Sequence, residues 1–166
     1  MSAILDKLKA MQAELDGKID SAPCYIAGDR IHAFEILKNK PGIAKIAIGF
    51  TKGVARSNFR GGDITGREDQ YFYAIVSRGR GLNQVRSDNQ IYGSGGGRPL
   101  FEIAETMRDG LRAMYFDPAT DEKPDYVSIQ EWDMGQRFNI DGYEVQIWVG
   151  TQLILPTPLQ TNMTVV

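Results

Sequence analysis

Hydrophobic residues near the start of the chain have the spacing of two amphipathic helices. They recur every three or four positions over residues 4–15, where Ser2 can cap the first turn and Gly17 follows the last. The same kind of spacing over residues 29–40 stops at Pro41, which disfavours helical geometry in the residue before it. The apolar positions are Ile4, Leu8, Met11 and Leu15 in the first segment and Ile31, Phe34 and Leu37 in the second.

Strand-like patterns lie between and after these two helices. Residues 23–27 form a short apolar run, and hydrophobic residues alternate with other types over residues 46–50. Residues 71–76 are rich in aromatic and β-branched side chains, which favour extended backbone. We expect strands in all three segments, with the second and third paired to each other.

The longest helical pattern begins at Pro99, a residue that suits the first turn of a helix. Its apolar stripe runs over about four turns and consists of Leu100, Ile103, Ala104, Met107, Leu111, Met114 and Tyr115. A helix with one apolar face buries that face against another element of the core. We expect it to pack on a sheet that contains Ile46, Ile48, Tyr73, Ile75, Val145, Ile147 and Val149.

The last part of the chain has the pattern of a β-hairpin followed by a tail. Apolar residues at 126–132 predict one strand, and Asp141 with Gly142 is a turn signal before the next. Hydrophobic and polar residues then alternate over residues 143–151, and the strand is expected to end near Pro156.

The order of these elements, α-β-α-β-β-α-β-β, predicts an α+β fold with helices packed on a mixed or antiparallel sheet. We expect one domain over residues 1–156 and an uncharged, extended C-terminal tail over residues 157–166. Two connections, residues 51–70 and 77–98, have little apolar periodicity, and ten of the 18 glycines lie in residues 53–97. Both connections are expected to be long Gly/Arg-rich loops that contacts with a partner order.

Composition and charge change this picture only slightly. With 166 residues, 42% of them hydrophobic, and a formal net charge of -2, the chain resembles an ordinary globular protein. Residues 52–98 carry eight Lys/Arg against four Asp/Glu, whereas residues 99–145 carry four against eleven. Opposite patches of this kind fix the orientation of subunits that meet through them. Two differently charged solvated faces of a monomer explain the same distribution equally well.

Neither a membrane segment nor a signal peptide is expected. No stretch approaches the roughly 20 consecutive apolar residues that a membrane-spanning helix needs. Residues 1–15 are too polar and too periodic for a signal peptide. We therefore expect a protein of the cytoplasm, or of a particle assembled there, with no membrane partner.

The chain offers few groups for catalysis or metal binding. Cys24 is the only cysteine and His32 the only histidine, so a Cys/His metal centre is not expected. Cys24 is interpreted as a small buried hydrophobic residue. His32 is the one candidate general base for a small hydrolase, with Asp29 and Glu35 nearby. Because no nucleophile motif accompanies it, a structural or surface role is favoured.

Three further patterns are too weak to predict a site. Residues 93–99 are glycine-rich and open a helix, but they lack the ending of a phosphate-binding P-loop. The acidic cluster in residues 117–125 lacks EF-hand spacing and is interpreted as a solvated loop. The arginines of the two loops have few aromatic residues among them, so nucleic-acid recognition is not expected. No cofactor and no metal are expected.

Several stretches together resemble the tail terminator, or tail completion, proteins of tailed bacteriophages. They are Ala-Ile-Val-Ser-Arg-Gly-Arg at residues 74–80, the helix start and its continuation at residues 99–111, and Tyr-Glu-Val-Gln-Ile-Trp-Val-Gly-Thr at residues 143–151. The opening helix over residues 4–15 matches as well. The resemblance covers most of residues 1–155 and is one of element order and side-chain pattern, without a catalytic signature.

The resemblance implies a structural virion protein at the head-proximal end of the tail, assembled in the host cytoplasm. Such proteins form a hexameric ring on the tail tube, stop its growth and present a surface to the head. No enzymatic activity or cofactor is implied. The implied partners are further copies of the chain, the tail tube protein, a head-tail connector or neck protein and, if the tail is contractile, the sheath protein, with DNA only passing through. The alternative is a head-tail connector or neck adaptor that forms a different ring.

The residues expected at subunit or partner interfaces lie in the expected loops and in the tail. The loop arginines are expected to make charge-assisted contacts with acidic groups on neighbours. The apolar tail residues are expected to lie on a neighbouring subunit or an adjoining tail protein, by strand addition to a sheet edge. The expected interface residues are Arg56, Arg60, Arg78, Arg80, Arg86, Arg98, Leu159, Met163 and Val165.

Overall fold

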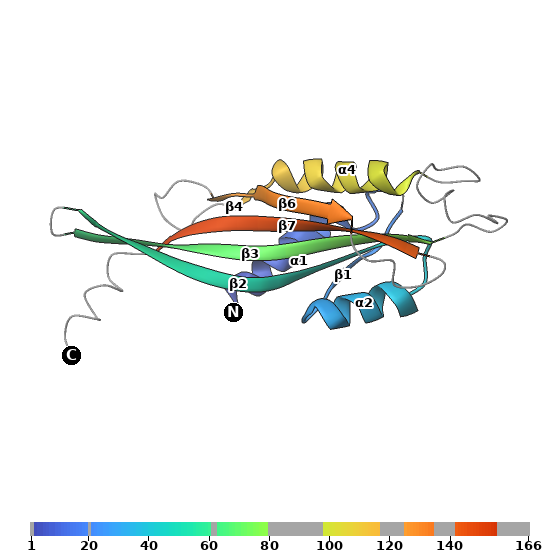
Figure 1. Ribbon diagram of the computed structural model, residues 1–166, viewed down its shortest axis with the longest axis horizontal. Coiled ribbons are helices and arrows are strands. Elements are labelled where there is room, and N and C mark those ends of the chain that lie inside the picture. Colours follow the sequence, from blue (N-terminus) through green and yellow to red (C-terminus); the bar gives the residue numbers. More distant parts are fainter. Residues whose placement is uncertain are drawn as a thin grey trace.

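The computed structural model describes residues 2–19, 21–60, 63–79, 98–116, 125–134 and 142–155. These residues form a sheet with helices on both faces, which confirms the α+β class (Figure 1). The elements are α1 (Ala3–Leu15), β1 (Cys24–Ile26), α2 (Arg30–Asn39), β2 (Ala44–Arg60), β3 (Asp63–Gly79), α4 (Leu100–Arg112), β4 (Tyr115–Phe116), β5 (Asp125–Tyr126), β6 (Ser128–Met134) and β7 (Gly142–Leu155).

The main sheet has the strand order β1-β2-β3-β7-β6, and β4 pairs with β5 in a separate two-stranded sheet. β1 runs parallel to β2, whereas the other neighbours in the main sheet are antiparallel. Ile46 of β2 lies opposite Val76 of β3, and Val76 in turn lies opposite Val145 of β7. The expected pairing of residues 46–50 with residues 71–76 is confirmed, and so is the antiparallel pairing of β6 with β7. The expected turn at Asp141 lies outside the described residues.

The expected limits of the first two helices are also confirmed. The third helix ends at Arg112, so the expectation that Tyr115 belongs to its apolar stripe is wrong, because Tyr115 lies in β4 and is 55% exposed. The Ser2 side chain accepts a hydrogen bond from the Leu5 backbone N–H at the start of α1. After α1 the chain turns at Gly17, which has a φ of 70° that side chains other than glycine disfavour. Asp29 caps α2 by accepting a hydrogen bond from the His32 backbone N–H at 2.7 Å.

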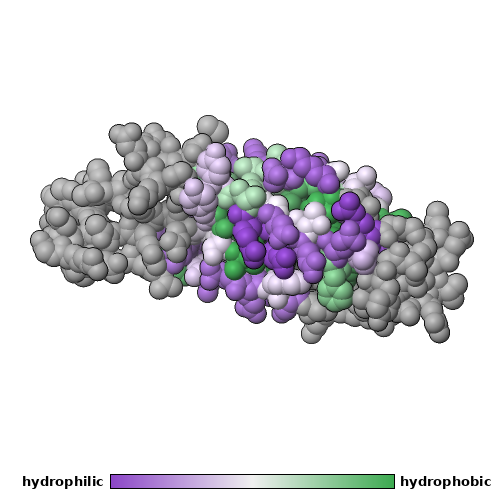
Figure 2. Space-filling view, turned by 90° about the horizontal axis from the view of Figure 1, so that it is seen from above, coloured by the Kyte–Doolittle hydropathy of each residue, from purple (hydrophilic) through white to green (hydrophobic). Residues whose placement is uncertain are grey.

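α1 and α4 cover one face of the main sheet and enclose the larger core. The apolar stripe of α4 is buried as expected, although Met114 just beyond it is only half-buried. Seen from above, hydrophilic residues dominate the described outer surface on this side (Figure 2). The strand residues that face α1 and α4 are Ala44, Ile46, Ile48, Phe72, Ala74, Val76, Ile147 and Val149.

α2 covers part of the opposite face and encloses a smaller core. Its members are Ala27, Ala33, Ile36, Leu37, Ala47, Tyr73 and Ile75. Tyr73 and Ile75 belong to the sheet on which the long helix packs, as expected, but they lie on its opposite face. Successive strand residues point to opposite faces, so Phe72, Ala74 and Val76 face α4 while Tyr73 and Ile75 face α2.

β2 and β3 continue well beyond the helices as a hairpin (Figure 1). We call residues 51–60 of β2 and 63–71 of β3 the arm, and residues 44–50 and 72–79 of the same strands the base. The expectation of a loop over residues 51–70 is wrong, because the arm is paired as far as Arg60 opposite Asp63. Only two residues, 61 and 62, separate this last pair, whereas the second expected loop lies mostly outside the described residues.

Candidate functional site

The outer edge of β2 is largely without a neighbouring strand among the described residues. β1 pairs with β2 only from Cys24 opposite Ile46 to Ile26 opposite Ile48. Ala27 then donates its backbone N–H to the Ile48 carbonyl at 2.8 Å, and β1 ends. Residues 49–60 continue as strand with β3 on one side only. We call this stretch the open edge, because such an edge presents backbone donors and acceptors to another strand.

The outer edge of β1 is closed in a way that the open edge is not. The Asp16 side chain accepts a hydrogen bond from the Cys24 backbone N–H at 2.8 Å. The Gln12 side chain donates to the Cys24 carbonyl, also at 2.8 Å. Two side chains from the end of α1 therefore occupy the backbone groups at Cys24 that a further strand would use. Among the described residues, the sheet is therefore protected at β1 and has no neighbouring strand along the open edge of β2.

A β-bulge marks the point at which the open edge begins. Phe50 lies opposite Phe72 and Lys52 opposite Tyr71, so Thr51 has no partner in β3. Phe50 packs edge-on against Phe72 on the α1/α4 side, with ring centroids 5.5 Å apart. Thr51 instead lines cavities on the side of α2. Bulges bend an edge strand and redirect its side chains, and this one does so immediately beyond β1.

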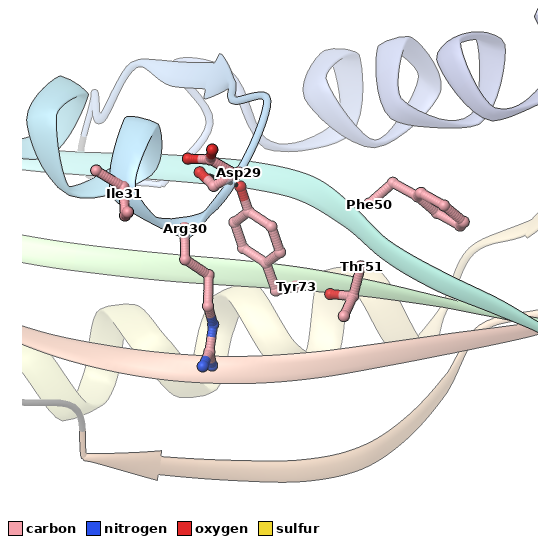
Figure 3. Close-up of a pocket in the computed structure, with 6 residues that line it drawn as sticks. All are labelled: Asp29, Arg30, Ile31, Phe50, Thr51 and Tyr73. Atoms are coloured by element: carbon pink, nitrogen blue, oxygen red, sulfur yellow. Dashed lines mark hydrogen bonds between the residues drawn. The ribbon is translucent and has the colours of Figure 1, made fainter.

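A cavity of about 350 Å³ lies between the start of α2 and the open edge, and we call it the edge pocket. Its lining residues are Asp29, Arg30, Ile31, Phe50, Thr51 and Tyr73 (Figure 3). Ile31 is 71% exposed, although the spacing of α2 predicts it on the buried face. That expectation is wrong because α2 buries Ala33, Ile36 and Leu37 instead. Ile31 consequently leaves an apolar side chain at the rim of the edge pocket.

The polar groups of the edge pocket are held in place by their own contacts. The Tyr73 hydroxyl donates a hydrogen bond to the Asp29 carbonyl at 3.0 Å. Burial and the nearby Asp29 carboxylate raise the pKa of Tyr73 to about 12, while Arg30 acts in the opposite direction. The Arg30 guanidinium lies 4.1 Å from the centre of the Trp148 ring and extends over the strands (Figure 3). The pocket therefore has a fixed wall with a protonated tyrosine.

A second cavity of about 300 Å³ shares Thr51 with the edge pocket. Its other lining residues are Lys52, Tyr71, Gln130, Glu131 and Trp148. The Lys52 ammonium lies 5.2 Å from the centre of the Tyr71 ring. The two cavities together extend the accessible surface from the open edge across the part of the sheet that α2 leaves uncovered.

A buried polar cluster lies on the other face, where the base meets the arm. The Lys7 ammonium donates to the Gln70 side-chain oxygen at 3.0 Å and to the Thr151 hydroxyl at 3.5 Å. It also lies 5.3 Å from the centre of the Phe116 ring. Lys7, Gln70 and Thr151 are all buried. The apolar core therefore ends at this cluster, and the arm continues beyond it.

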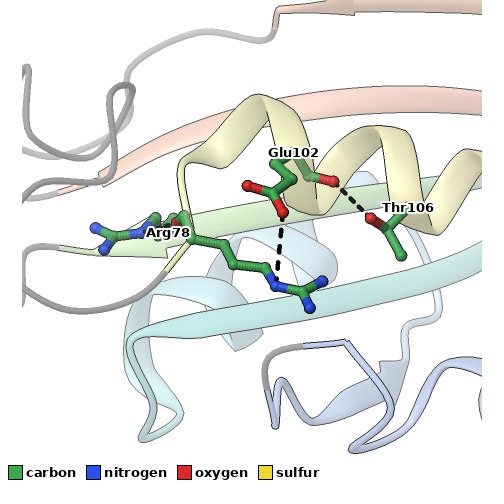
Figure 4. Close-up of polar contacts among 4 residues, drawn as sticks. Arg78, Glu102 and Thr106 are labelled. Carbon is green, nitrogen blue, oxygen red and sulfur yellow. Dashed lines mark hydrogen bonds and ion pairs between the residues drawn. The ribbon is translucent and has the colours of Figure 1, made fainter.

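The expectation that Arg78 lies at an interface is wrong. Its side chain is fully buried and donates to the Arg98 carbonyl at 2.7 Å and to the Gly79 carbonyl at 3.0 Å. Figure 4 shows Arg78 near the start of α4. The cause is strand alternation, which places Arg78 on the same face as Val76 and Ala74, next to the start of α4. Arg78 thus supports the entry into α4 and is inaccessible to a partner.

The other expected interface residues fall into three groups. Arg98 is exposed, and its Nε lies 3.7 Å from the Glu102 carboxylate one turn later. Arg56 and Arg60 lie on β2 within the open edge. Arg80, Arg86, Leu159, Met163 and Val165 lie outside the described residues. The open edge therefore contains two of the expected residues, and the edge pocket contains none of them.

His32 and Cys24 are not arranged for catalysis. His32 is exposed, and its Nδ1 accepts a hydrogen bond from the Gly28 backbone N–H at 3.0 Å. The neutral ring then carries its proton on Nε2, so no nitrogen lone pair remains for a general base. Cys24 is buried as expected, and burial, reinforced by Asp16, raises the pKa of its thiol to about 12. At neutral pH this thiol is therefore not a nucleophile.

The remaining sequence patterns are only partly described. Residues 93–97 of the glycine-rich stretch and residues 117–124 of the acidic cluster lie outside the described residues. Within the described part of the chain, no group of three or more His, Cys, Asp or Glu side chains is placed to hold a metal ion. No described helix is long and apolar enough to cross a membrane.

The chain matches no protein-family model, and no curated protein is significantly similar to it in sequence. The open edge and the edge pocket are therefore the features from which a function is argued.

Proposed function

We propose that the chain is a structural subunit of a tailed-phage particle. In this proposal it forms a ring on the tail tube, ends growth of the tube and provides the surface to which the head or neck attaches. The open edge of β2 is the observation that carries the proposal. The resemblance to tail terminator proteins is the reason for proposing a phage tail as the particle. Residues 49–60 form a long strand with one side unpaired among the described residues, which is the kind of surface that joins copies of a protein.

Ring formation requires two different surfaces on each subunit that fit each other, since one repeated head-to-tail contact generates a closed ring. The open edge supplies one of these two surfaces. Monomeric proteins usually blunt such edges with short strands, covering loops or side-chain caps. The cap that Asp16 and Gln12 provide at Cys24 shows this protection on β1, where the open edge has no counterpart among the described residues.

The hydrolase alternative has no support in the site geometry. The Nδ1 atom of His32 is occupied by a backbone hydrogen bond. The two residues with the most strongly raised pKa values, Cys24 and Tyr73, both keep their protons at neutral pH. Acid–base catalysis near pH 7 needs groups that titrate near that pH.

Imaging of the purified protein by negative-stain electron microscopy tests the proposal. We expect sixfold rings, either alone at high concentration or on the ends of tail tubes after the tail tube protein is added. Twelvefold rings that bind the portal side of heads would favour a connector or neck adaptor instead. Only monomers in the presence of tubes would contradict both. Particles assembled without this chain should have tails of abnormal length or tails detached from heads.

A further inference from the structure

We propose that the open edge of β2 accepts residues 159–166 from a second copy of this chain as an added β-strand, with an apolar side chain in the edge pocket. This inference deepens the proposed function, and only its place in a ring rests on that function. Strand addition between copies is a property of the chain that can be tested without any other phage protein.

The open edge has the length and position that an added strand needs. An eight-residue strand spans about 27 Å, and the twelve residues at 49–60 offer about 40 Å. Because β1 ends at Ile26, opposite Ile48, a strand added beyond this point continues the line of β1 along β2 without displacing it. Backbone hydrogen bonds to an edge give affinity, and pockets beside the edge give specificity.

The edge pocket lies where such a strand would begin. Its walls come from the start of α2 and from Phe50, Thr51 and Tyr73 of the sheet. Ile31 stands at the rim with 71% of its surface exposed. The surface of this cavity of about 350 Å³ is mostly apolar, although Asp29 and Arg30 also line it, and the cavity is large enough for a Leu or Met side chain. An incoming apolar residue would cover Ile31 and fill the space between α2 and the open edge.

Residues 159–166 have the sequence of a strand that fits this place. They read Leu-Gln-Thr-Asn-Met-Thr-Val-Val and contain no charged residue and no proline. In an extended strand, Leu159, Met163 and Val165 share one face with a threonine between them, and the opposite face begins Gln, Asn, Thr. This alternation is typical of a half-buried strand. The apolar face supplies Leu and Met for the edge pocket.

The strand must come from another copy if it begins at Leu159. β7 ends at Leu155, opposite Gly66 of β3, and β3 separates β7 from β2. A strand on the outer edge of β2 would lie three strand spacings from β7, or about 14 Å through the sheet. Four fully extended residue steps from Leu155 to Leu159 reach no more than about 14 Å. A path around the arm is longer, so Leu159 cannot reach the open edge of its own copy.

Disulfide cross-linking between two full-length variants tests the inference. One chain carries Thr51→Cys on the α2 side of the open edge, and the other carries a cysteine at Leu159, Met163 or Val165. The native Cys24 is buried, and burial raises the pKa of its thiol to about 12, so the introduced thiols are the reactive ones at neutral pH. A cross-link between two differently tagged chains joins two copies by construction.

Matched positions distinguish a paired strand from chance contact. The same cross-linking is run with cysteines at Gln160, Asn162 and Thr164, which lie on the other face of the segment. We expect at least about fivefold more cross-linked dimer from Leu159, Met163 and Val165, because alternate strand residues face opposite ways. Equal yields from both sets, or yields no higher than those of an Ala10→Cys control on the exposed side of α1, would overturn the inference.

Charge variants separate this inference from the proposed function. Leu159→Asp combined with Met163→Asp should weaken self-association by at least about tenfold in sedimentation experiments, since a charged strand face cannot enter an apolar pocket. Gln160→Asp combined with Asn162→Asp adds the same charge to the other face and should have much less effect. Rings that form equally well from all these variants would overturn strand addition and leave the ring function standing. Cross-links of the expected pattern without rings would leave strand addition standing and overturn the ring.

Discussion

The base and the arm are built from the same two strands, yet they owe their structure to different causes. In the base, helices cover both faces, so Ile46 and Ile48 are buried on one side and Ala47 on the other. In the arm, Thr51, Lys52, Gly53 and Ala55 are exposed, and only Val54 among the first five residues is half-buried. The base is held by packing on both faces, whereas the root of the arm is held by the pairing of β3 with both β2 and β7 and by the buried polar side chains of Asp69 and Gln70.

This difference shows how one pair of strands can serve two purposes. Packing on both faces makes the base the stable part of the sheet, because burial of apolar surface is the dominant favourable contribution to folding. The arm has fewer buried apolar side chains at its root, and its β2 edge has no neighbouring strand among the described residues. Substitutions that remove packing should therefore distinguish the two regions clearly.

The largest difference in stability between base and arm variants is expected when a core side chain that packs on the base is truncated. Leu111→Ala in α4 should lower the free energy of unfolding by about 2 to 5 kcal/mol, because the residue is fully buried and its removal leaves a cavity. Val54→Ala in the arm should cost less than about 1 kcal/mol, since Val54 is only half-buried. Urea unfolding of both variants provides the comparison. Equal losses would show that the arm is packed as tightly as the base.

A smaller difference is expected from two glycines of β2. A side chain at Gly49 would collide with the ring of Tyr73, which lies across that position in the buried base. Gly49→Ala should therefore cost about 1 to 3 kcal/mol, as overpacking of a core does. At Gly53 the same change meets the flexible Glu68 side chain, which can shift at the cost of the hydrogen bond that its carboxylate accepts from Gln70. Thermal unfolding should show a lower melting temperature for Gly49→Ala and a smaller decrease for Gly53→Ala.

The smallest effect concerns the pH dependence of the base. The pKa of Tyr73 is raised from 10.0 to about 12, so the folded state holds the phenolic proton more tightly than the unfolded chain. The resulting stability is complete below pH 10 and is lost as the pH rises toward 12, by at most about 1.4 kcal/mol for each pH unit. Tyr73→Phe should start about 0.5 to 1.5 kcal/mol less stable, because the hydrogen bond to Asp29 is lost.

Urea unfolding of both proteins at pH 8, 10 and 11 checks this expectation. The decline between pH 10 and pH 11 should be shallower for Tyr73→Phe than for the original chain. Cys24 titrates in the same range in both proteins, so it does not contribute to the difference between them. Identical slopes would mean that the Tyr73 hydroxyl is accessible to solvent in the folded protein.

The sequence predicts the base well because residues that pack in a core are apolar and recur with a regular spacing. Residues 46–50 and 71–76 are apolar where helices cover them, and α4 shows its buried stripe over its whole length. The root of the arm has no such apolar pattern, because its β2 residues are mostly exposed and the buried residues of β3 there, Asp69 and Gln70, are polar. One signal was present, because the pair Gly61-Gly62 between residues of strand-forming type is typical of a two-residue hairpin connection.

The candidate site was less accessible to sequence reasoning than the fold. The edge pocket joins the start of α2 with Thr51 and Tyr73, which are far apart in the chain. The position of the edge pocket depends on where β1 ends along β2. No sequence pattern in either strand specifies how far their pairing extends. The prediction that Arg78 lies at an interface was wrong for a different reason. The sequence does not distinguish a buried arginine that donates to backbone carbonyls from an exposed one.

The register of the sheet also determines the order in which its strands can form. β2 and β3 are joined by only two residues, and hairpins of this type form within about 1 to 10 microseconds. β7 must join β3 from Gly79 opposite Gly142, after closure of a loop of roughly sixty residues, which carries a larger entropic cost. We therefore expect the hairpin to exist before β7 arrives. During that interval the edge of β3 that later pairs with β7 is exposed, as is the open edge. Aggregation of newly made chains therefore competes with folding until β7 has paired with β3.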